Sequence, residues 1–505
     1  MIAGITEKEQ KIIEHILDKY RKDYAFFYYG SRVKGTYEKT SDLDVLIKGK
    51  AEMPLAILQE IKEEFDKSDL PYIVNFSDYY KLDSSFYERI KPDLIPYNWQ
   101  EVKLGDVCKF QNGYAFKSSQ FTNNGNIKII KIKEIKEGKI IFFDDSASVF
   151  YNDKYKKYQV ENDDILVALT GDPVARPNPA SWVGRIAIFK GSEKALINQR
   201  VAKFLPNKTV LFPLFIYYFF RDFNNFYNLA KKATGSASQA NISTDMLENT
   251  EILLPPLDVQ KKIAGVLGAL DDKIELNNKI NQNLEAQAQA LFKSWFVDFE
   301  PFGGQMPSDW KIGKLGDICE CLLGGTPNRN IPEFWNGNIP WINSGEVNAF
   351  RITKPSEYIS ELGLSKSATK LLPAKTTVIA ITGATLGKVS LLEINSCANQ
   401  SVVGVLPNSN IPYEFIYPFV KHNILELISH QTGGAQQHIN KQNVEQIKLY
   451  IPPYGILHQY QTSVKPIYKM IANNCFENTR LAEVRDILLP KLMSGEISVD
   501  DVKID

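Results

Sequence analysis

Two long stretches of the chain carry apolar side chains at regular helical spacing. In the first, about residues 258–299, seam positions recur at alternating steps of four and three residues between Leu270 and Trp295. The second, about residues 456–492, repeats this pattern, and the two seams coincide when Ile467 is laid on Leu270. Such heptad spacing is typical of helices that pack along one continuous stripe. We therefore predict two helices of roughly 50 Å each, which bury their seams against each other as an antiparallel coiled coil.

The polar interruptions of the seam are repeated as well. Under the same alignment Asn277 coincides with Asn474, and Asn281 coincides with Asn478. Buried asparagines gain by hydrogen bonding to one another, and they fix the register at which two helices pair. The alternative, two unrelated core helices of a large domain, gives no reason for matched asparagines at a shared offset.

The segments that precede the two helices are also copies of each other. Trp99 opens the sequence WQEVKLGDVCKF and Trp310 opens WKIGKLGDICEC, with Lys-Leu-Gly-Asp at the same distance from each tryptophan. Short apolar runs between Gly, Asn and Pro turns predict mixed α/β globular units. We interpret the body as a tandem duplication of globular unit and helix. The further matches are 167–171 with 379–383, Asn198-Gln199 with Asn399-Gln400, the segments that begin at Thr234 and Thr432, and the Pro-Pro pairs at 255–256 and 452–453.

The two copies differ most in their loops. The sequence ARPNPASWVGR at residues 175–185 is answered by the shorter TLGK at residues 385–388. Similar frames with unlike loops suit two units that perform one task on two different targets.

A smaller α/β unit is predicted at the beginning of the chain. An apolar strand at residues 25–29 leads into Gly30 and Ser31, and Asp42 and Asp44 lie on the next apolar segment. Because alternate residues of a strand point to the same face, the two carboxylates project together. Paired carboxylates hold divalent cations against phosphate oxygens, and a Gly-Ser turn lets the backbone approach a phosphate closely.

Composition narrows the setting in which the protein works. The 505 residues include 59 Lys or Arg and 59 Asp or Glu, so a nucleic-acid contact needs locally segregated charge or a basic partner. The five cysteines form no CxxC pair, and the sequence contains neither a signal sequence nor an apolar run of eighteen residues. We expect a reduced, cytoplasmic protein without a membrane segment. The most apolar run, residues 210–220, is predicted to be a buried helix.

The Gly-Ser turn and the paired aspartates resemble those of the minimal nucleotidyltransferases of the polymerase-beta superfamily, including antitoxin-type members that transfer AMP to a partner protein. The resemblance covers most of residues 6–95. It implies ATP and magnesium as cofactors of this domain. It also implies phosphate contacts at Gly30, Ser31, and Arg32 or Lys34, and magnesium ligands at Asp42 and Asp44.

One position of this domain departs from the family pattern. The family carries a third carboxylate on a later strand, and the aligned residue here is Asn75. A neutral amide lacks the charge to complete a two-metal site. Asp78 lies an odd number of residues further on, so it is expected to face the other side of the strand. The sequence leaves three alternatives open: an enzyme that nucleotidylates a partner protein, a domain that binds a nucleotide without turnover, or a domain that binds a partner.

The duplicated body resembles the specificity subunits of type I restriction-modification enzymes from residue 99 to about residue 495. The most specific segments are LFKSWFVDFEPF (291–302), LLPKLMSGEISV (488–499), TGSASQANIS and TGGAQQHIN. The resemblance implies two target recognition domains that read the halves of a bipartite site in double-stranded DNA. It also implies that two methyltransferase subunits dock on the chain and that restriction subunits join them. The specificity module itself then needs no cofactor, because S-adenosylmethionine belongs to the methyltransferase.

The body carries no catalytic signature of its own. Pro452-Pro453 follows Ile451, where adenine methyltransferases have an asparagine that holds the flipped base, and no GxxxxGK[ST] loop occurs. Methylation and ATP-driven cleavage are therefore expected from partners.

The predicted fold class is α+β: a small nucleotidyltransferase-like α/β domain, then two mixed α/β target recognition domains separated by two long antiparallel coiled-coil helices. The predicted boundaries are 1–95 for the first domain, 96–256 and 303–453 for the two recognition domains, 257–302 for the first repeat helix, and 454–505 for the second helix and its tail.

Base readout requires side chains that hydrogen-bond bidentately, chiefly Arg or Lys to guanine and Asn or Gln to adenine. Such side chains, together with hydroxyl groups, occur in the loops of both recognition domains. The Gly-Ser and Gly-Gly turns have an alternative interpretation as entries to helices near Ile242 and Ile439. The candidate DNA contacts are Lys117, Ser118, Arg176, Asn178, Ser236, Ser238 and Gln239 in the first domain, and Asn328, Arg329, Asn343, Gln436, Gln437 and His438 in the second.

Overall fold

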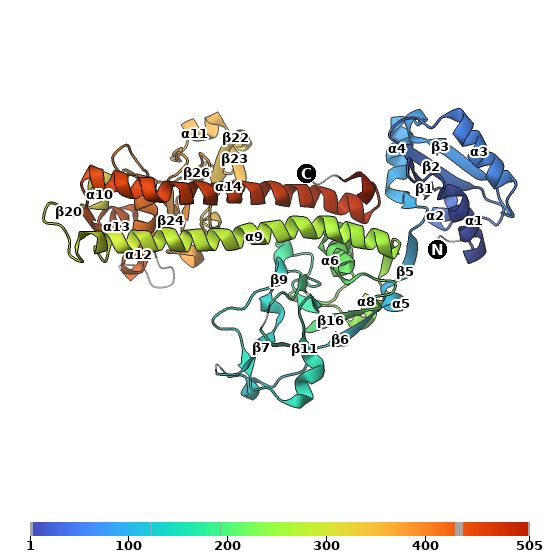
Figure 1. Ribbon diagram of the computed structural model, residues 1–505, viewed down its shortest axis with the longest axis horizontal. Helices are drawn as coiled ribbons and strands as arrows, with labels where there is room; N and C mark the ends of the chain where they lie inside the picture. Colours follow the sequence, from blue (N-terminus) through green and yellow to red (C-terminus); the bar gives the residue numbers. More distant parts are fainter. Residues whose placement is uncertain (1–3, 123, 192, 430–437, 503–505) are drawn as a thin grey trace. The chain divides into compact units, whose positions relative to one another are not determined.

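The computed structural model describes residues 4–122, 124–191, 193–429 and 438–502. The chain divides into two compact units. Figure 1 shows its helices and strands, coloured from the amino terminus to the carboxyl terminus. The first unit contains Met1–Ala269 and Arg485–Asp505, and the second contains Leu270–Val484. Within the described ranges, no helix is long and apolar enough to cross a membrane.

The two predicted long helices are present as α9 (Leu257–Phe296) and α14 (Tyr454–Met493), each of 40 residues. Each begins directly after a Pro-Pro pair, at 255–256 and 452–453. Proline cannot donate a backbone hydrogen bond and has a fixed φ, so it is well suited to the start of a helix, where the first N–H groups have no partner within the helix. The same chemical signal therefore starts both copies.

Hydrogen bonds between asparagines show that the two helices pair antiparallel in the second unit. Asn277 Nδ2 donates to Asn478 Oδ1 at 2.9 Å, and Asn474 Nδ2 donates to Asn281 Oδ1 at 2.9 Å. Asn277 and Asn281 are each 1% exposed, so these amides satisfy one another where water is excluded. Each asparagine thus bonds to the copy of the other, as expected when two equivalent helices run in opposite directions.

The first globular repeat, residues 96–256, is built from short strands around a buried helix. Its sheets have the orders β6-β16-β12-β14-β9-β8, β10-β7-β15-β11, β13-β18-β17 and β19-β5. The predicted buried helix is confirmed as α6 (Pro213–Arg221). The other elements are β5 (Gln100–Lys103), α5 (Leu104–Val107), β6 (Cys108–Asn112), β7 (Ile127–Ile130), β8 (Ile135–Lys136), β9 (Gly138–Ile140), β10 (Ser148–Val149), β11 (Gln159–Val160), β12 (Ile165–Ala168), β13 (Thr170–Gly171), β14 (Ile186–Ile188), β15 (Ala195–Ile197), β16 (Val201–Pro206), α7 (Phe223–Lys231), β17 (Thr234–Ser236), β18 (Gln239–Asn241), α8 (Thr244–Glu248) and β19 (Glu251–Leu254).

The second globular repeat, residues 303–453, has the sheet orders β21-β27-β24-β25, β23-β22-β26 and β20-β28. Strand β24 lies between β27 and β25 just as β12 lies between β16 and β14, and β22 is parallel to β26 just as β7 is parallel to β15. The two repeats therefore share one fold. Its elements are β20 (Lys311–Lys314), α10 (Leu315–Ile318), β21 (Cys321–Leu323), β22 (Trp335–Ile342), β23 (Glu357–Ile359), α11 (Glu361–Ser365), β24 (Thr377–Ala380), β25 (Val389–Leu391), β26 (Cys397–Ala398), β27 (Val402–Val405), α12 (Tyr413–Ser429), α13 (Lys441–Glu445) and β28 (Lys448–Ile451).

The amino-terminal domain is a four-stranded sheet of order β3-β2-β1-β4 with flanking helices. Strand β2 is antiparallel to β1 and parallel to β3, so the ends of all three meet near the Gly-Ser turn. The elements are α1 (Glu7–Leu17), β1 (Tyr24–Tyr29), α2 (Ser31–Lys34), β2 (Leu43–Gly49), α3 (Leu55–Asp66), β3 (Val74–Asp78), α4 (Ser84–Ile90) and β4 (Ile95–Pro96).

The amino-terminal domain and the first repeat meet without a free linker. Tyr97 is buried in the core of the amino-terminal domain, and its hydroxyl donates to Asp18 Oδ1 at 2.5 Å. Trp99 is buried in the core of the first repeat. Only Asn98 separates these two anchors.

A buried ionic network ties the second repeat to α9. Arg351 is fully buried, and its guanidinium donates to Glu285 Oε2 at 2.7 Å and to the Tyr417 hydroxyl at 2.9 Å. Lys421 Nζ donates to Glu285 Oε1 at 2.9 Å, and Glu393 lies 3.7 Å from the Arg351 Nε. Burial favours the neutral form of Glu285, but the charges of Arg351 and Lys421 outweigh it and hold the pKa of Glu285 below its ordinary value.

Replacing Arg351 should unsettle the second unit strongly. Arg351→Met leaves the Glu285 and Glu393 carboxylates in a buried site without their central partner, which costs about 3–5 kcal/mol. We expect the unfolding temperature of the second unit, measured by calorimetry, to fall by roughly 10 °C. The matched control is Lys354→Met, which breaks the exposed 2.7 Å pair with Glu483 and should cost no more than about 1 kcal/mol. Equal shifts in the two variants would contradict the role of the network.

Candidate functional site

The paired aspartates lie beside the Gly-Ser turn at the end of β2. Asp44 is in register with Tyr29 on β1 and with Asn75 on β3, and Asp42 immediately precedes the strand. Gly30 has a φ of +85°, and a Cβ atom there would lie 2.2 Å from Asp44 Oδ2. Only glycine permits both this conformation and this approach. The backbone of the turn is therefore packed directly against the Asp44 carboxylate.

The electrostatics of this cluster favour a cation. Burial raises the pKa of Asp44, a hydrogen bond with Asn75 opposes the rise, and the charge of Asp42 adds to it. Asn75 Nδ2 also donates to Asp42 Oδ2 at 3.0 Å. Ser31 directly follows Gly30 as the first residue of α2. A cation between the two carboxylates would relieve their mutual repulsion.

The chemistry of the donors suits one divalent cation and not two. Magnesium is commonly held by one or two carboxylates, with phosphate oxygens and water completing its shell. A two-cation clamp needs further anionic oxygen, and Asn75 offers Asp42 an N–H donor instead. Among the described residues, no group of three or more His, Cys, Asp or Glu side chains is arranged to hold a metal ion.

Arg32 has a structural role, which corrects the phosphate contact suggested for it from the sequence. It is 1% exposed, its Nη2 donates to the Ser41 carbonyl at 2.7 Å, and its guanidinium lies 3.8 Å from the centre of the Tyr72 ring. It thus braces the loop that leads to the aspartates. Lys34 is exposed, and its Nζ lies 3.0 Å from Asp93 Oδ2.

Asp78 points away from this cluster, as its spacing predicts. Its Oδ2 accepts a hydrogen bond from the Met53 N–H at 2.8 Å, and its Oδ1 accepts one from the Tyr80 N–H at 2.9 Å. Both carboxylate oxygens are therefore used to hold a turn.

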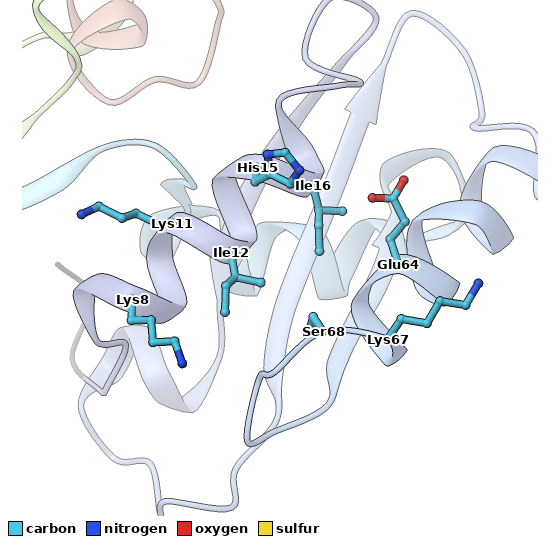
Figure 2. Close-up of a pocket in the computed structure, with 8 residues that line it drawn as sticks. All are labelled: Lys8, Lys11, Ile12, His15, Ile16, Glu64, Lys67 and Ser68. Atoms are coloured by element: carbon cyan, nitrogen blue, oxygen red, sulfur yellow. The ribbon is translucent and has the colours of Figure 1, made fainter.

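A separate groove of about 540 Å³ lies between α1 and α3 of the same domain. Figure 2 shows Ile12 and Ile16 among charged side chains from both helices. Two of its lysines already have acidic neighbours, because Lys11 pairs with Glu7 and Lys67 pairs with Glu63. None of its lining residues is a candidate phosphate or cation contact, so the groove is distinct from the carboxylate cluster.

In the first globular repeat, Ser236, Ser238 and Gln239 lie together on a β-hairpin formed by β17 and β18. The hairpin is exposed, and β18 pairs with β13. The Ser236 and Ser238 hydroxyls are 3.1 Å apart, and the Gln239 side chain makes no hydrogen bond to any residue that the structure describes. The turn is part of this hairpin, and α8 begins shortly after it with Ser243 as its N-cap, so the hairpin also leads into a helix near Ile242 as the alternative interpretation expects.

Arg200 lies beside the same hairpin, although the sequence patterns did not identify it as a candidate DNA contact. Its Nη1 donates to Asn241 Oδ1 at 3.2 Å, and Asn241 is the last residue of the hairpin. Thr170 Oγ1 also donates to Asn241 Oδ1, at 3.1 Å. Its position in the sequence could have indicated Arg200, because it directly follows the Asn198-Gln199 pair that both repeats share. The second repeat has Ser401 at the equivalent position, so the two repeats no longer match at this residue.

The other candidates of the first repeat lie in two loops. Lys117 and Ser118 are exposed at a short turn. Arg176 is exposed, and its carbonyl accepts a hydrogen bond from the indole of the buried Trp182 at 2.8 Å. Asn178 caps the following turn, since its Oδ1 accepts from the Ala180 N–H at 3.1 Å. The Asn178 side-chain oxygen is therefore already used by the backbone.

Candidates in the second repeat are more strongly engaged by the protein itself. The Arg329 guanidinium makes a two-pronged pair with Glu357, one contact being Nη2 to Oε1 at 2.9 Å, and it lies 3.6 Å from the Trp335 ring centre. This pairing lowers the pKa of Glu357. Asn328 and Asn343 each accept a backbone N–H two residues further on, at 3.0 Å and 2.7 Å. Base contact through Arg329 would thus require Glu357 to be displaced.

His438 occupies the position equivalent to Asn241. It forms an antiparallel bridge with Thr382, as Asn241 does with Thr170. The following residue confirms the match, because the Ile439 N–H donates to the Ile381 carbonyl at 3.0 Å and the Ile242 N–H donates to the equivalent Leu169 carbonyl at 2.9 Å. Gln436 and Gln437 lie outside the described residues.

Two family models match the chain. The model described as the type I restriction modification DNA specificity domain matches residues 96–286 and 307–485, which together make up most of the chain. The model described as the nucleotidyltransferase domain matches residues 9–103.

Individual relatives follow the same division. The HindI specificity subunit of Haemophilus influenzae is 25% identical over 475 residues, covering 79% of this chain and 100% of that protein. The MjaIX specificity subunit of Methanocaldococcus jannaschii is 29% identical over 336 residues, covering 63% and 76%. A probable protein adenylyltransferase, MntA, of Haemophilus influenzae is 36% identical over 87 residues, covering 17% of this chain and 76% of that protein.

Gly30→Ala should disrupt the carboxylate cluster. The new methyl group meets Asp44 Oδ2 at a backbone conformation that alanine resists, so we expect a loss of about 2 kcal/mol or more in the stability of the amino-terminal domain. Gly35→Ala is the control, because Gly35 has a φ of +68° but no atom within 4 Å of its added Cβ. It should cost only about 1 kcal/mol. Hydrogen exchange of β1 and β2 amides in the full chain measures both, and equal losses would contradict the close approach at Gly30.

Proposed function

Because the chain belongs to the type I restriction-modification DNA specificity family, we propose that it selects a bipartite site in double-stranded DNA for partner subunits to modify. Each globular repeat reads one half of the site, and the paired helices act as the spacer between the two readers. Two methyltransferase subunits, which bring S-adenosylmethionine, supply the methylation, and restriction subunits supply the cleavage. The specificity module contributes recognition and needs no cofactor.

The observation that carries this proposal is that the same fold occurs twice in the chain, with different loops at the equivalent edge of the two copies. The bridges between Thr170 and Asn241 and between Thr382 and His438 are equivalent in the two repeats. The loop that follows each threonine is the part in which the copies differ most, residues 175–185 against residues 385–388. A frame shared by both repeats, with a different loop at one edge, is what two readers of different half-sites require.

The hairpin of the first repeat has the shape and chemistry of a reading element. A two-stranded β-ribbon fits the major groove of B-DNA, and a glutamine can bond both acceptor and donor of adenine. The exposed Gln239 lies at the start of β18, and exposed Lys231 and Lys232 come just before β17. Arg200 lies at the base of the hairpin, so positive charge is concentrated around it. This local concentration allows contact with DNA phosphates although the net charge of the whole chain is zero.

The complex with a methyltransferase partner should select duplexes that carry two short motifs separated by an unread gap. Sequencing of duplexes selected from a random library measures this directly. The chain alone serves as a comparison for the contribution of the partner. A single uninterrupted motif would contradict two readers.

Gln239→Ala should relax one position of one half-site and leave the other half-site unchanged. Loss of a bidentate base contact removes about 1–3 kcal/mol of discrimination against wrong bases. Competition binding with duplexes altered at single positions measures the effect. The half-site read by the second repeat is the internal control, and equal weakening on every sequence would assign Gln239 to backbone contact instead.

A further inference from the structure

We propose that the amino-terminal domain binds a nucleoside triphosphate with a single divalent cation and does not transfer its nucleotidyl group, because Asn75 lies where a third carboxylate would be needed. This inference does not rest on DNA reading by the body. It concerns a site formed entirely within the first 95 residues.

The binding half of the proposal rests on the turn and the two aspartates. Gly30 brings the backbone against the Asp44 carboxylate, and Asp42 lies beside it with one oxygen facing Asn75. Two carboxylates and the phosphate oxygens of a nucleotide complete the usual shell of one magnesium ion. Lys34 is exposed just after the turn, and among the described residues its ammonium group has one ion pair, with Asp93 Oδ2 at 3.0 Å. In the proposed site this exposed ammonium group is assigned to contact a phosphate.

The second half follows from what nucleotidyl transfer requires. The α-phosphorus bonds to an acceptor hydroxyl oxygen, pyrophosphate leaves, and the hydroxyl proton must pass to a base. A second cation, held by a further carboxylate, normally activates the attacking oxygen. Asn75 is paired in register with Asp44 and donates to Asp42, so it lies at that position. Its amide can neither accept the proton nor bridge two cations.

The nearest acidic side chain on the same strand, Asp78, is not placed to substitute. Asp78 is buried, and both of its oxygens accept backbone N–H groups. Asp78 therefore does not compensate for the departure at Asn75.

The test measures nucleotide and cation binding on the full chain. A fluorescent ATP analogue with magnesium reports nucleotide binding, and electron paramagnetic resonance with manganese and ATP counts the bound cations. We expect the unchanged chain to bind the analogue and one manganese ion, and Asp44→Asn to lose both. Asp69→Asn, which changes an exposed carboxylate of the same domain, is the matched control and should bind like the unchanged chain.

Asn75→Asp separates the two halves of the proposal. The added carboxylate should raise the manganese count from one to two while nucleotide binding is retained. Transfer of labelled AMP by the unchanged chain, to itself or to a methyltransferase partner, would overturn the proposal if Asp44→Asn abolished it. Failure of the unchanged chain to bind the analogue, or a count of two before the substitution, would also overturn it. None of these outcomes depends on whether the body selects a bipartite DNA site.

Discussion

The pairing of Asn277 with Asn478 and of Asn281 with Asn474 is the constraint on which the duplicated body depends. A hydrogen bond between two neutral amides contributes only about 1 kcal/mol when formed, but each buried amide left without a partner costs about 1–3 kcal/mol. A slip of one heptad would still place apolar seam positions against one another and would leave these amides facing apolar surface. The asparagines therefore select one register out of several that hydrophobic packing alone would allow. Because each asparagine bonds to the copy of the other, the duplication itself supplies both halves of this lock.

Features with a period could be predicted from the sequence, and features without one could not. The heptad spacing predicted both long helices, and the matched tryptophans and Pro-Pro pairs predicted the two copies of the globular domain. Glu285 gave no such signal, because a glutamate within an amphipathic helix is expected at the surface. Its partner Arg351 lies in a loop of the second repeat, 66 residues away. Only the fold brings the two together, and burial then turns an ordinary ion pair into an anchor that would be costly to break.

The same limit applies to the predicted contact residues. Residue type identified side chains that can bond a base or a phosphate, but it could not tell which are already occupied. Arg32 donates to the Ser41 carbonyl, Arg329 pairs with Glu357, and the Asn343 side chain accepts a backbone N–H of its own turn. Arg200 has the right chemistry and the right edge, yet it lies in a strand connection with no repeated partner to draw attention to it. Only the fold shows which partner each of these side chains already has and at which edge of the domain it lies.

The amino-terminal domain shows how little must change to separate binding from chemistry. Aspartate and asparagine have nearly the same size and the same place on β3, so the sheet, the turn at Gly30 and the approach to Asp44 tolerate either. What differs is that one offers a negative oxygen and the other an N–H donor, and the donor is directed at Asp42. The parallel register between β2 and β3 makes that difference decisive, because it fixes the side chain of residue 75 beside both aspartates. A site that keeps its glycine turn and its carboxylate pair retains the means to hold a phosphate-bound cation, whereas the step that needs a base depends on one position alone.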